Sequence, residues 1–321
     1  MRNSGGGGAA RIPYHRAMGT VFLNGELVER DAARVSAFDA GFQHGVGLFE
    51  TMTGVVTEGG EARIVGLIEH CERLVESART LRLSDDMRAD RLADACVETL
   101  ERAAGSDEDD LSRARVRLTV TGGDLNLLEA QGQSNVSPTV MIACQPATAY
   151  PEEMYERGVL ATIADARTNP LDPFAGHKSL NYWWRLRELQ LAAGRGAGES
   201  LVLQVSNHAS GGCVSNLIAI HGDRALTPIA RGEEAEGGVP SPVLPGVTRA
   251  MALGWLEERG LEVERRMMPV GDVLDADEVV LTNSSWGVLP VVRVEAETVG
   301  SGQVGPVARD LIERWRGHTG R

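Results

Sequence analysis

The sequence has few of the residues that mark several classes of protein. Only 4 of the 321 residues are cysteines, and Cys71, Cys96, Cys144 and Cys213 form no Cys-x-x-Cys pair. We therefore expect reduced, mostly buried thiols rather than a zinc site or a disulfide framework. No apolar run approaches the roughly 18 residues of a membrane span, and the N-terminus lacks the charged-then-apolar order of a signal peptide. A cytoplasmic location without membrane contact is the expectation.

Positive charge is also scarce. The chain has 32 Lys and Arg against 45 Asp and Glu, a net charge of -13. Nucleic-acid binding depends on clustered cations that release counterions from phosphates, so this balance disfavours a nucleic-acid partner but leaves a small anionic ligand open. With 42% hydrophobic and 24% charged residues, the composition is that of a soluble globular protein. The length allows one or two domains.

The first half of the chain predicts antiparallel strands and two helices. Asn24-Gly25 lies between short apolar runs, which is typical of a hairpin with a type I′ turn. From Leu67 to Leu81 the apolar residues recur every three or four positions, which indicates one face of a helix. The other elements expected here are strands over 49–56, 62–65, 113–121 and 139–143 and a helix over 88–104.

The second half predicts a mixed order of strands and helices. The elements expected are strands over 159–164, 200–205, 214–220, 279–281 and 291–294 and at 263, and helices over 180–193, 245–259 and 307–315. The proline-bearing segment 145–151 is expected to link two domains. We expect a disordered, glycine-rich stretch over 1–15, an N-terminal α/β domain over 16–146 and a larger C-terminal α/β domain over 152–321.

Four separate features could carry chemistry or bind an anion. Lys178 precedes an apolar helix, and Pro245-Gly246-Val247-Thr248 opens another helix whose free N–H groups suit a phosphate. Thr282-Asn283-Ser284-Ser285 gathers hydroxyls after a buried strand, and Arg73 lies one residue off the apolar stripe of its helix. Taken singly, each also fits a solvated side chain, an ordinary helix start or a polar turn.

Together these features resemble the class IV aminotransferases. The matching motifs, in the order and approximate spacing of that family, are Asp39-Ala-Gly41-Phe42-Gln-His44-Gly45-Val-Gly47-Leu-Phe49-Glu50-Thr51, His70-x-x-Arg73-Leu74, Lys178-Ser-Leu-Asn181, Asn216-Leu217, Leu244-Pro245-Gly246-Val247-Thr248-Arg249 and Thr282-Asn283-Ser284. The family, called fold type IV, includes branched-chain aminotransferases, D-amino-acid aminotransferases and aminodeoxychorismate lyases. The resemblance implies an α/β (α+β) fold of two domains, an N-terminal α/β sandwich and a C-terminal pseudo-barrel, with pyridoxal 5'-phosphate between them, usually in a homodimer.

The resemblance also implies roles for individual residues. Lys178 would form the Schiff base with the cofactor and then carry the proton between the substrate Cα and the cofactor. Arg73 would pair with the phosphate, together with the backbone N–H groups of Val247 and Thr248 and the hydroxyl of Ser284. Burial would have to lower the pKa of Lys178, because a protonated lysine cannot act as a base.

The largest departure from the family is at Gly211. The family has a glutamate against the pyridine nitrogen five residues before the asparagine of its strand, and counting back from Asn216 gives Gly211. Such a carboxylate lets the ring accept electrons from the substrate. Another group could replace it, with Glu199, Asn207 and His208 the nearest in sequence, or a water could bridge. The reaction could instead need a weaker electron sink, or activity could be lost.

Other departures concern the substrate. Family members commonly have an arginine, an aromatic and an aspartate where this chain has Ala40, His44 and Val46. His44 could bind a substrate carboxylate or pack under the next loop. Arg115 and Arg117 are better candidates because a guanidinium binds a carboxylate with two hydrogen bonds, although a solvated strand face is the alternative. Ser285 is a further candidate substrate contact.

Three functional hypotheses result. The favoured one is amino-group transfer between an amino acid and a 2-oxo acid. The alternative is an aminodeoxychorismate lyase, which expels pyruvate and leaves an aromatic amine; Lys-Ser-Leu-Asn and Thr-Asn-Ser lean towards that subgroup. The third is a non-catalytic homologue, which Gly211 alone supports.

Overall fold

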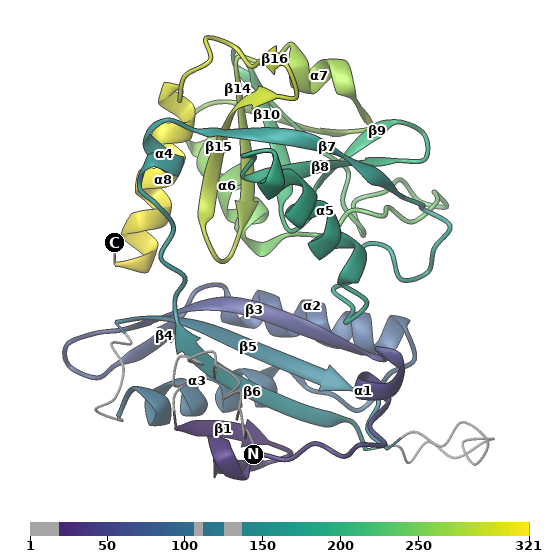
Figure 1. Cartoon of the computed structure of the whole chain (residues 1–321), viewed down its shortest axis with the longest axis vertical. Helices are drawn as coiled ribbons and strands as arrows, with labels where there is room; N and C mark the ends of the chain where they lie inside the picture. Colours follow the sequence, from purple (N-terminus) through teal and green to yellow (C-terminus); the bar gives the residue numbers. More distant parts are fainter. Residues whose placement is uncertain (1–18, 106–111, 125–136, 321) are drawn as a thin grey trace, which may run out of the picture.

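The computed structural model describes residues 19–105, 112–124 and 137–320, which form two β-sheets flanked by helices (Figure 1). The six-stranded sheet comes from the chain up to Pro146 and the ten-stranded sheet from Val159 onward. The glycine-rich segment predicted to be disordered lies outside the described residues. In the described part of the chain, no helix is long and apolar enough to cross a membrane.

The first sheet is antiparallel throughout, in the order β2-β1-β6-β5-β3-β4. Its strands are β1 (Thr20–Leu23), β2 (Glu26–Glu29), β3 (Gly47–Val56), β4 (Ala62–Ile64), β5 (Arg113–Thr121) and β6 (Thr139–Pro146). The helices of this part are η1 (Arg30–Ala32), α1 (Ala40–His44), α2 (Leu67–Thr80) and α3 (Ala89–Ala104). The apolar faces of α2 and α3 pack on one face of the sheet and form a core around Leu74, Leu100 and Leu118. The other face therefore remains available to the second half of the chain.

The second sheet is mixed, in the order β12-β11-β10-β14-β15-β7-β8-β9-β13, with β16 paired to β15. Its strands are β7 (Val159–Thr168), β8 (Glu199–Gln204), β9 (His208–Gly212), β10 (Asn216–His221), β11 (Arg224–Pro228), β12 (Glu262–Arg266), β13 (Met268–Pro269), β14 (Glu278–Asn283), β15 (Gly287–Val294) and β16 (Glu297–Thr298). Its helices are α4 (Glu153–Glu156), α5 (Trp183–Gly194), α6 (Val247–Glu258), α7 (Val270–Leu274) and α8 (Pro306–Thr319). Only Met267 separates the two edge strands β12 and β13, so the sheet curls until its edges meet, as the predicted pseudo-barrel requires.

Most predicted elements are present, with shifted ends. The Asn24-Gly25 hairpin is confirmed, with both residues at positive φ. The linker predicted over 145–151 is partly wrong, because β6 continues through Pro146. The helix predicted from 180 begins at Trp183 because the residues before it pair with β3. Among the elements not predicted are β9, which holds two consecutive glycines, and β11, which is short and ends in proline.

Candidate active site

The candidate active site is a cavity of about 480 Å³ that both halves of the chain line. A volume of this size fits a small-molecule cofactor with its substrate. The predicted site residues that line it are Arg73, Arg115, Arg117, Lys178, Val247, Thr248, Ser284 and Ser285. The described residues of the wall include four arginines and one lysine but neither Asp nor Glu, although the chain is acidic. The cavity is therefore suited to an anion.

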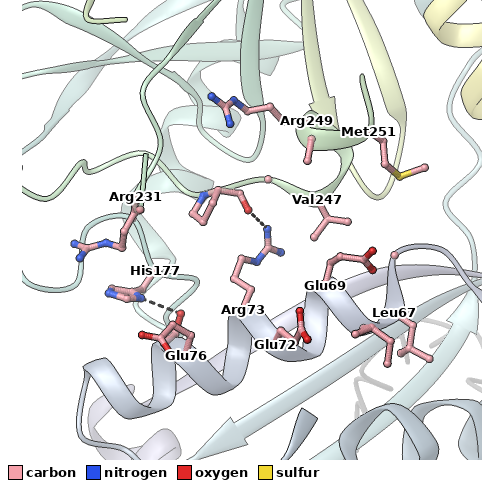
Figure 2. Close-up of a pocket in the computed structure, with 18 of the residues that line it drawn as sticks. Leu67, Glu69, Glu72, Arg73, Glu76, His177, Arg231, Val247, Arg249 and Met251 are labelled. Atoms are coloured by element: carbon pink, nitrogen blue, oxygen red, sulfur yellow. Dashed lines mark hydrogen bonds between the residues drawn. The ribbon is translucent and has the colours of Figure 1, made fainter. Parts of the chain in front are cut away.

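A larger groove of about 1070 Å³ lies on another side of Arg73 (Figure 2). Its described wall includes the acidic side chains Glu69, Glu72 and Glu76 of α2, and Lys178 is not part of it. We therefore place the candidate site in the smaller cavity.

Lys178 is fixed in position by backbone pairing between the two halves of the chain. Its carbonyl accepts a hydrogen bond from the N–H of Phe49 (2.9 Å), and the N–H of Leu180 donates to the carbonyl of Gly47 (2.9 Å). The adjacent His177 places Nδ1 2.9 Å from Ser77 Oγ on α2. The segment that carries the lysine thus joins the edge of β3, and the Nζ atom lies 4.5 Å from the centre of the Phe49 ring.

Lys178 is the only lysine of the chain; all its other basic side chains, histidines aside, are arginines. An arginine cannot lose its proton in a protein, whereas a buried lysine can. Burial lowers the pKa of Lys178 to about 7; Glu50 acts against this shift, and the neighbouring Arg73, Arg117 and Arg185 add to it. A large fraction of the amine is thus neutral near pH 7, as a nucleophile and a base must be.

Glu50 organises one end of the cavity from behind its wall. Its carboxylate is 1% exposed and accepts hydrogen bonds from Arg73 Nε (2.9 Å) and Nη2 (2.6 Å) and from His70 Nδ1 (2.8 Å). Burial alone would raise the pKa of Glu50, but Arg73 and His70 outweigh burial and hold the pKa well below its usual range. An ionised Glu50 therefore fixes the guanidinium of Arg73.

The same network reaches two hydroxyls. His70 Nε2 is 3.1 Å from Ser284 Oγ, and Ser284 Oγ is 3.3 Å from Thr248 Oγ1. Burial lowers the pKa of His70 even though Glu50 raises it, so the imidazole is neutral at pH 7. Thr53 also donates a hydrogen bond to the carbonyl of Ser284. Bonds from β3 and α2 thus hold the turn after β14 in place.

The N-terminus of α6 completes this end. Arg73 Nη1 donates to the carbonyl of Pro245 (2.7 Å), the dashed bond from Arg73 in Figure 2. Gly246 caps α6 without a side-chain hydrogen bond, so the first N–H groups of the helix, on Val247 and Thr248, have no cap. A Cβ at Gly246 would overlap the side-chain amide of Asn216, so only glycine fits this close approach.

A phosphate group fits this arrangement. It would meet an uncapped helix N-terminus, the hydroxyls of Thr248 and Ser284 and the N–H groups of Arg73 that Glu50 and Pro245 do not use. Helix N-termini and guanidinium groups are the usual partners of phosphate. The phosphate end of the cavity, as we call this group of residues, therefore has the donor set that pyridoxal 5'-phosphate needs.

The side chains of Arg117 and Arg115 extend from β5 and line the cavity. The Arg117 guanidinium stacks on the Phe49 ring, 3.4 Å from its centre, and donates to Thr51 Oγ1 (3.2 Å). Burial lowers the pKa of Arg117 to about 10, which leaves it charged at pH 7. Arg115 is more exposed and donates to Gln145. Arg117 is thus the better placed of the two to bind a carboxylate beside Lys178.

Another part of the cavity wall, which we call the ring end, is formed by the end of β9 and the turn that follows it. Gly211 has φ +139°, and Gly212 lines the cavity. A Cβ on Gly211 would lie 2.7 Å from the carbonyl oxygen of Ser215. A side chain at Gly211 therefore requires the backbone to shift, and the missing glutamate cannot simply be restored.

The three sequence candidates for replacing that glutamate differ in position. Asn207 is exposed at a turn with φ +62°, and the partly exposed His208 contacts Ser206. Glu199 is 0% exposed and lies against the turn after Gly212. Of the three, only Glu199 is buried behind the cavity wall, and it is also the only one that has a carboxyl group.

The sequence motifs did not predict two features of the cavity wall. His44, a candidate substrate ligand, is exposed on α1 and is not part of the cavity wall that the described residues form. Conversely, Tyr182 and Arg185 line the cavity without having been singled out; Arg185 donates to the carbonyl of Cys213 (2.7 Å). The sequence signal that could have identified them is that they follow Lys178 closely in the chain, at the start of α5.

Known proteins resemble this chain over nearly its whole length. It is 27% identical to a putative branched-chain-amino-acid aminotransferase of Methanocaldococcus jannaschii, covering 92% of this chain and 95% of that protein. It is also 27% identical to a D-alanine aminotransferase of Staphylococcus haemolyticus, covering 92% of this chain and 96% of that one.

Two solved structures share the fold. The branched-chain aminotransferase of Escherichia coli superposes with a TM-score of 0.81 at 25% identity, covering 94% of each chain. The 4-amino-4-deoxychorismate lyase of Pseudomonas aeruginosa gives a TM-score of 0.74 at 28% identity, covering 92% of this chain and 98% of the other. The family model described as amino-transferase class IV matches residues 47–294. This chain belongs to the class IV aminotransferase family, whose members depend on pyridoxal phosphate.

Proposed function

We propose that this protein transfers an amino group between an amino acid and a 2-oxo acid, using pyridoxal 5'-phosphate bound to Lys178. The observation that carries the proposal is that the only lysine of the chain, with its pKa lowered to about 7, shares one cavity with the phosphate end. The branched-chain and D-alanine aminotransferases among the relatives support the same reaction class.

Different residues of the cavity bind the cofactor and transfer the proton. Arg73, Thr248, Ser284 and the N-terminus of α6 hold the phosphate. The bound cofactor supplies an electron sink for the pair of electrons left when the substrate loses its Cα proton. Lys178 takes that proton as a neutral amine and returns it later, and its lowered pKa allows both steps.

Substrate recognition rests on the arginines of β5. Arg117 lies next to Lys178 and stacks on Phe49, where it can bind the substrate carboxylate with two hydrogen bonds. Arg115, nearer the solvent, and Ser285, in the turn after β14, line the same cavity and can contact the rest of the substrate. His44 is exposed and is not among the described residues that line the cavity, so we assign it no contact with the substrate in its own chain.

A homodimer is part of this proposal. The side chains of Phe42 and Trp183 are 79% and 81% exposed. Their segments lie close together, because the N–H of Leu180 donates to the carbonyl of Gly47. Exposed aromatic side chains of this kind favour a protein interface. Analytical ultracentrifugation should give twice the chain mass.

A reducing, cytoplasmic location also fits the proposal. All four cysteines are free and buried. Burial raises the pKa of Cys144 to about 12 and also raises the pKa of Cys213, and the hydrogen bond with Cys71, together with burial, raises the pKa of Cys96. These thiols are inert parts of the cores, as in proteins of a reducing compartment.

The reaction can be tested with the purified protein and pyridoxal phosphate. We expect conversion of amino-acid and 2-oxo-acid pairs that needs both members of the pair. The 28% identity to a 4-amino-4-deoxychorismate lyase makes that reaction the second candidate. Release of pyruvate from aminodeoxychorismate without an added acceptor would replace the transferase by the lyase. Cofactor binding without turnover of either substrate class would support a non-catalytic homologue instead.

A further inference from the structure

The ring end of the cavity has no acidic side chain in its described wall, although the family resemblance leads us to expect a glutamate at Gly211. The two glycines of β9 supply no side chain in its place. A Cβ on Gly212 would lie 2.8 Å from Oε2 of Glu199 and would overlap the hydroxyl of Ser215. Glu199 and Ser215 therefore occupy the space that a side chain at Gly212 would take.

Glu199 reaches this space from the neighbouring strand. It begins β8, which pairs with β9, and its side chain is completely buried. Oε1 accepts a hydrogen bond from the N–H of Ser200 (2.9 Å), and Oε2 accepts from the N–H of Val214 (3.3 Å) and from Ser215 Oγ (2.9 Å). The carboxyl group is thus fixed on the turn that ends the cavity, and Ser215 is its contact on the cavity side.

We propose that Glu199, acting through the hydroxyl of Ser215, serves the pyridine nitrogen of the cofactor in place of the glutamate that is missing at Gly211. This inference rests on the proposed function, because it assumes that pyridoxal phosphate occupies the cavity. Ser215 is then the residue that contacts the ring, and Glu199 is a positioning residue behind it.

The hydrogen-bond chain accounts for one proton in either of two arrangements. With the proton on the ring, the ring N–H donates to Ser215 Oγ, which donates to the Glu199 carboxylate. With the proton on Glu199, the carboxylic acid donates to Ser215, which donates to the ring nitrogen. The serine hydroxyl can turn between the two arrangements, so a proton can be held at the ring without a carboxylate touching it.

The surroundings of Glu199 allow it to hold or release a proton near neutral pH. Burial raises the pKa of Glu199 to about 7, against the hydrogen bonds from Ser200, Ser215 and Val214. An ordinary exposed glutamate, in contrast, releases its proton near pH 4.3. A buried neutral donor and acceptor pair is also what a dry cavity end tolerates best.

Arg185 is the competing group at this end. Its guanidinium donates to the carbonyl of Cys213 and lies 4.4 Å from the Trp184 ring centre and 5.7 Å from the Tyr182 ring centre. An arginine beside the nitrogen would favour an unprotonated ring, because the guanidinium can only donate. The carbonyl of Cys213 and the two rings already engage this guanidinium, which favours Glu199 and Ser215.

The test is the protonation state of the ring in the holoenzyme. The protein would be loaded with pyridoxal phosphate carrying ¹⁵N in the ring, and the ¹⁵N chemical shift would be recorded at pH 7. We expect a mainly protonated nitrogen in the wild type. In both Ser215→Ala and Glu199→Gln the shift should move by more than half of the full range towards the unprotonated value.

The matched control is Glu188→Gln, which changes another buried glutamate whose carboxylate accepts a hydrogen bond from the N–H of Asp165 (3.0 Å) on β7. It should leave the ¹⁵N shift in place. If Glu199→Gln does not fold, Ser215→Ala alone decides. An unprotonated ring in the wild type, or a shift that Ser215→Ala does not move, overturns the proposal while leaving the proposed function intact. A wild-type protein that takes up no cofactor overturns both.

Discussion

Two buried glutamates stand behind the two ends of the cavity, and they differ in their partners. Glu50 contacts the charged Arg73 and is ionised. Glu199 contacts backbone N–H groups and a serine hydroxyl, and its pKa is raised to about 7. The same side chain is therefore a permanent anion at the phosphate end and a proton-sharing group at the ring end. The charge of its partner, rather than burial alone, decides whether a buried glutamate in this cavity is ionised or holds a proton.

The largest effect should follow from removing the anion at the phosphate end. Glu50→Ala leaves Arg73 nearly buried without its counter-charge, and breaking a buried pair in this way costs about 3–5 kcal/mol. Urea unfolding of the apo-protein measures this loss. Glu72→Ala, an exposed glutamate next to Arg73 on α2, is the control and should change stability by less than about 0.5 kcal/mol. Equal effects of the two changes would contradict the role given to Glu50.

A smaller effect is expected at the ring end from Gly211→Ala. The residue has φ +139°, a backbone conformation that favours glycine, and an added Cβ would meet the carbonyl of Ser215. We expect a loss of about 3 kcal/mol in the free energy of unfolding. Gly232 also has a positive φ, +89°, but has nothing within 4 Å of its added Cβ, so Gly232→Ala should cost about 1 kcal/mol. The difference between the two variants measures the crowding at the ring end.

The contrast between the glutamates also predicts a pH dependence. Between pH 4.5 and about 7 the folded protein holds a proton on Glu199 that the unfolded chain has released. This contribution is fully present below pH 4.5 and is lost as the pH rises to 7, with a slope of up to about 1.4 kcal/mol per pH unit. Glu199→Gln should remove that slope from the pH profile of apo-protein stability, and Glu188→Gln should not. A slope unchanged in Glu199→Gln would contradict the raised pKa.

Lys178 lies in the same cavity, and its reactivity tests the combined effect of burial, Glu50 and the neighbouring arginines on its pKa. With a pKa of about 7 the neutral amine is lost as the pH falls through 7, so attachment of pyridoxal to the apo-protein should be about tenfold faster at pH 8 than at pH 6 and level off above pH 8. Stopped-flow absorbance measures this rate. The chain has no other lysine, so the absorbance change reports Lys178 without a background from other lysine side chains. A rate that keeps rising to pH 10 would indicate an ordinary, solvated amine.

The sequence predicted the phosphate end better than the ring end, for a physical reason. Phosphate binding uses a helix start, an arginine and hydroxyls, each of which leaves a local pattern around Arg73, Thr248 and Ser284. The ring end depends on which residue of β8 lies beside which residue of β9. Strand β9 has Gly211 and Gly212 instead of alternating apolar residues, so its pairing with β8 could not be predicted.

The same distinction applies to the fold. Local signals such as Asn24-Gly25 and the apolar stripe of α2 gave their elements almost to the residue. The start of α5 was placed too early because residues 178–180 pair with β3, more than a hundred positions earlier in the chain. That long-range pairing is also what brings Lys178 to the cavity, and no local pattern encodes it.

The most direct test of the account is where the cofactor attaches. Holoenzyme reduced with borohydride should gain the mass of one reduced cofactor, and peptide mapping should place it on Lys178. Both Lys178→Ala and Lys178→Arg should abolish the adduct, because an arginine stays protonated and cannot form the bond. An adduct on the N-terminal amine, the only other primary amine of the chain, or one that survives in Lys178→Ala, would contradict the account.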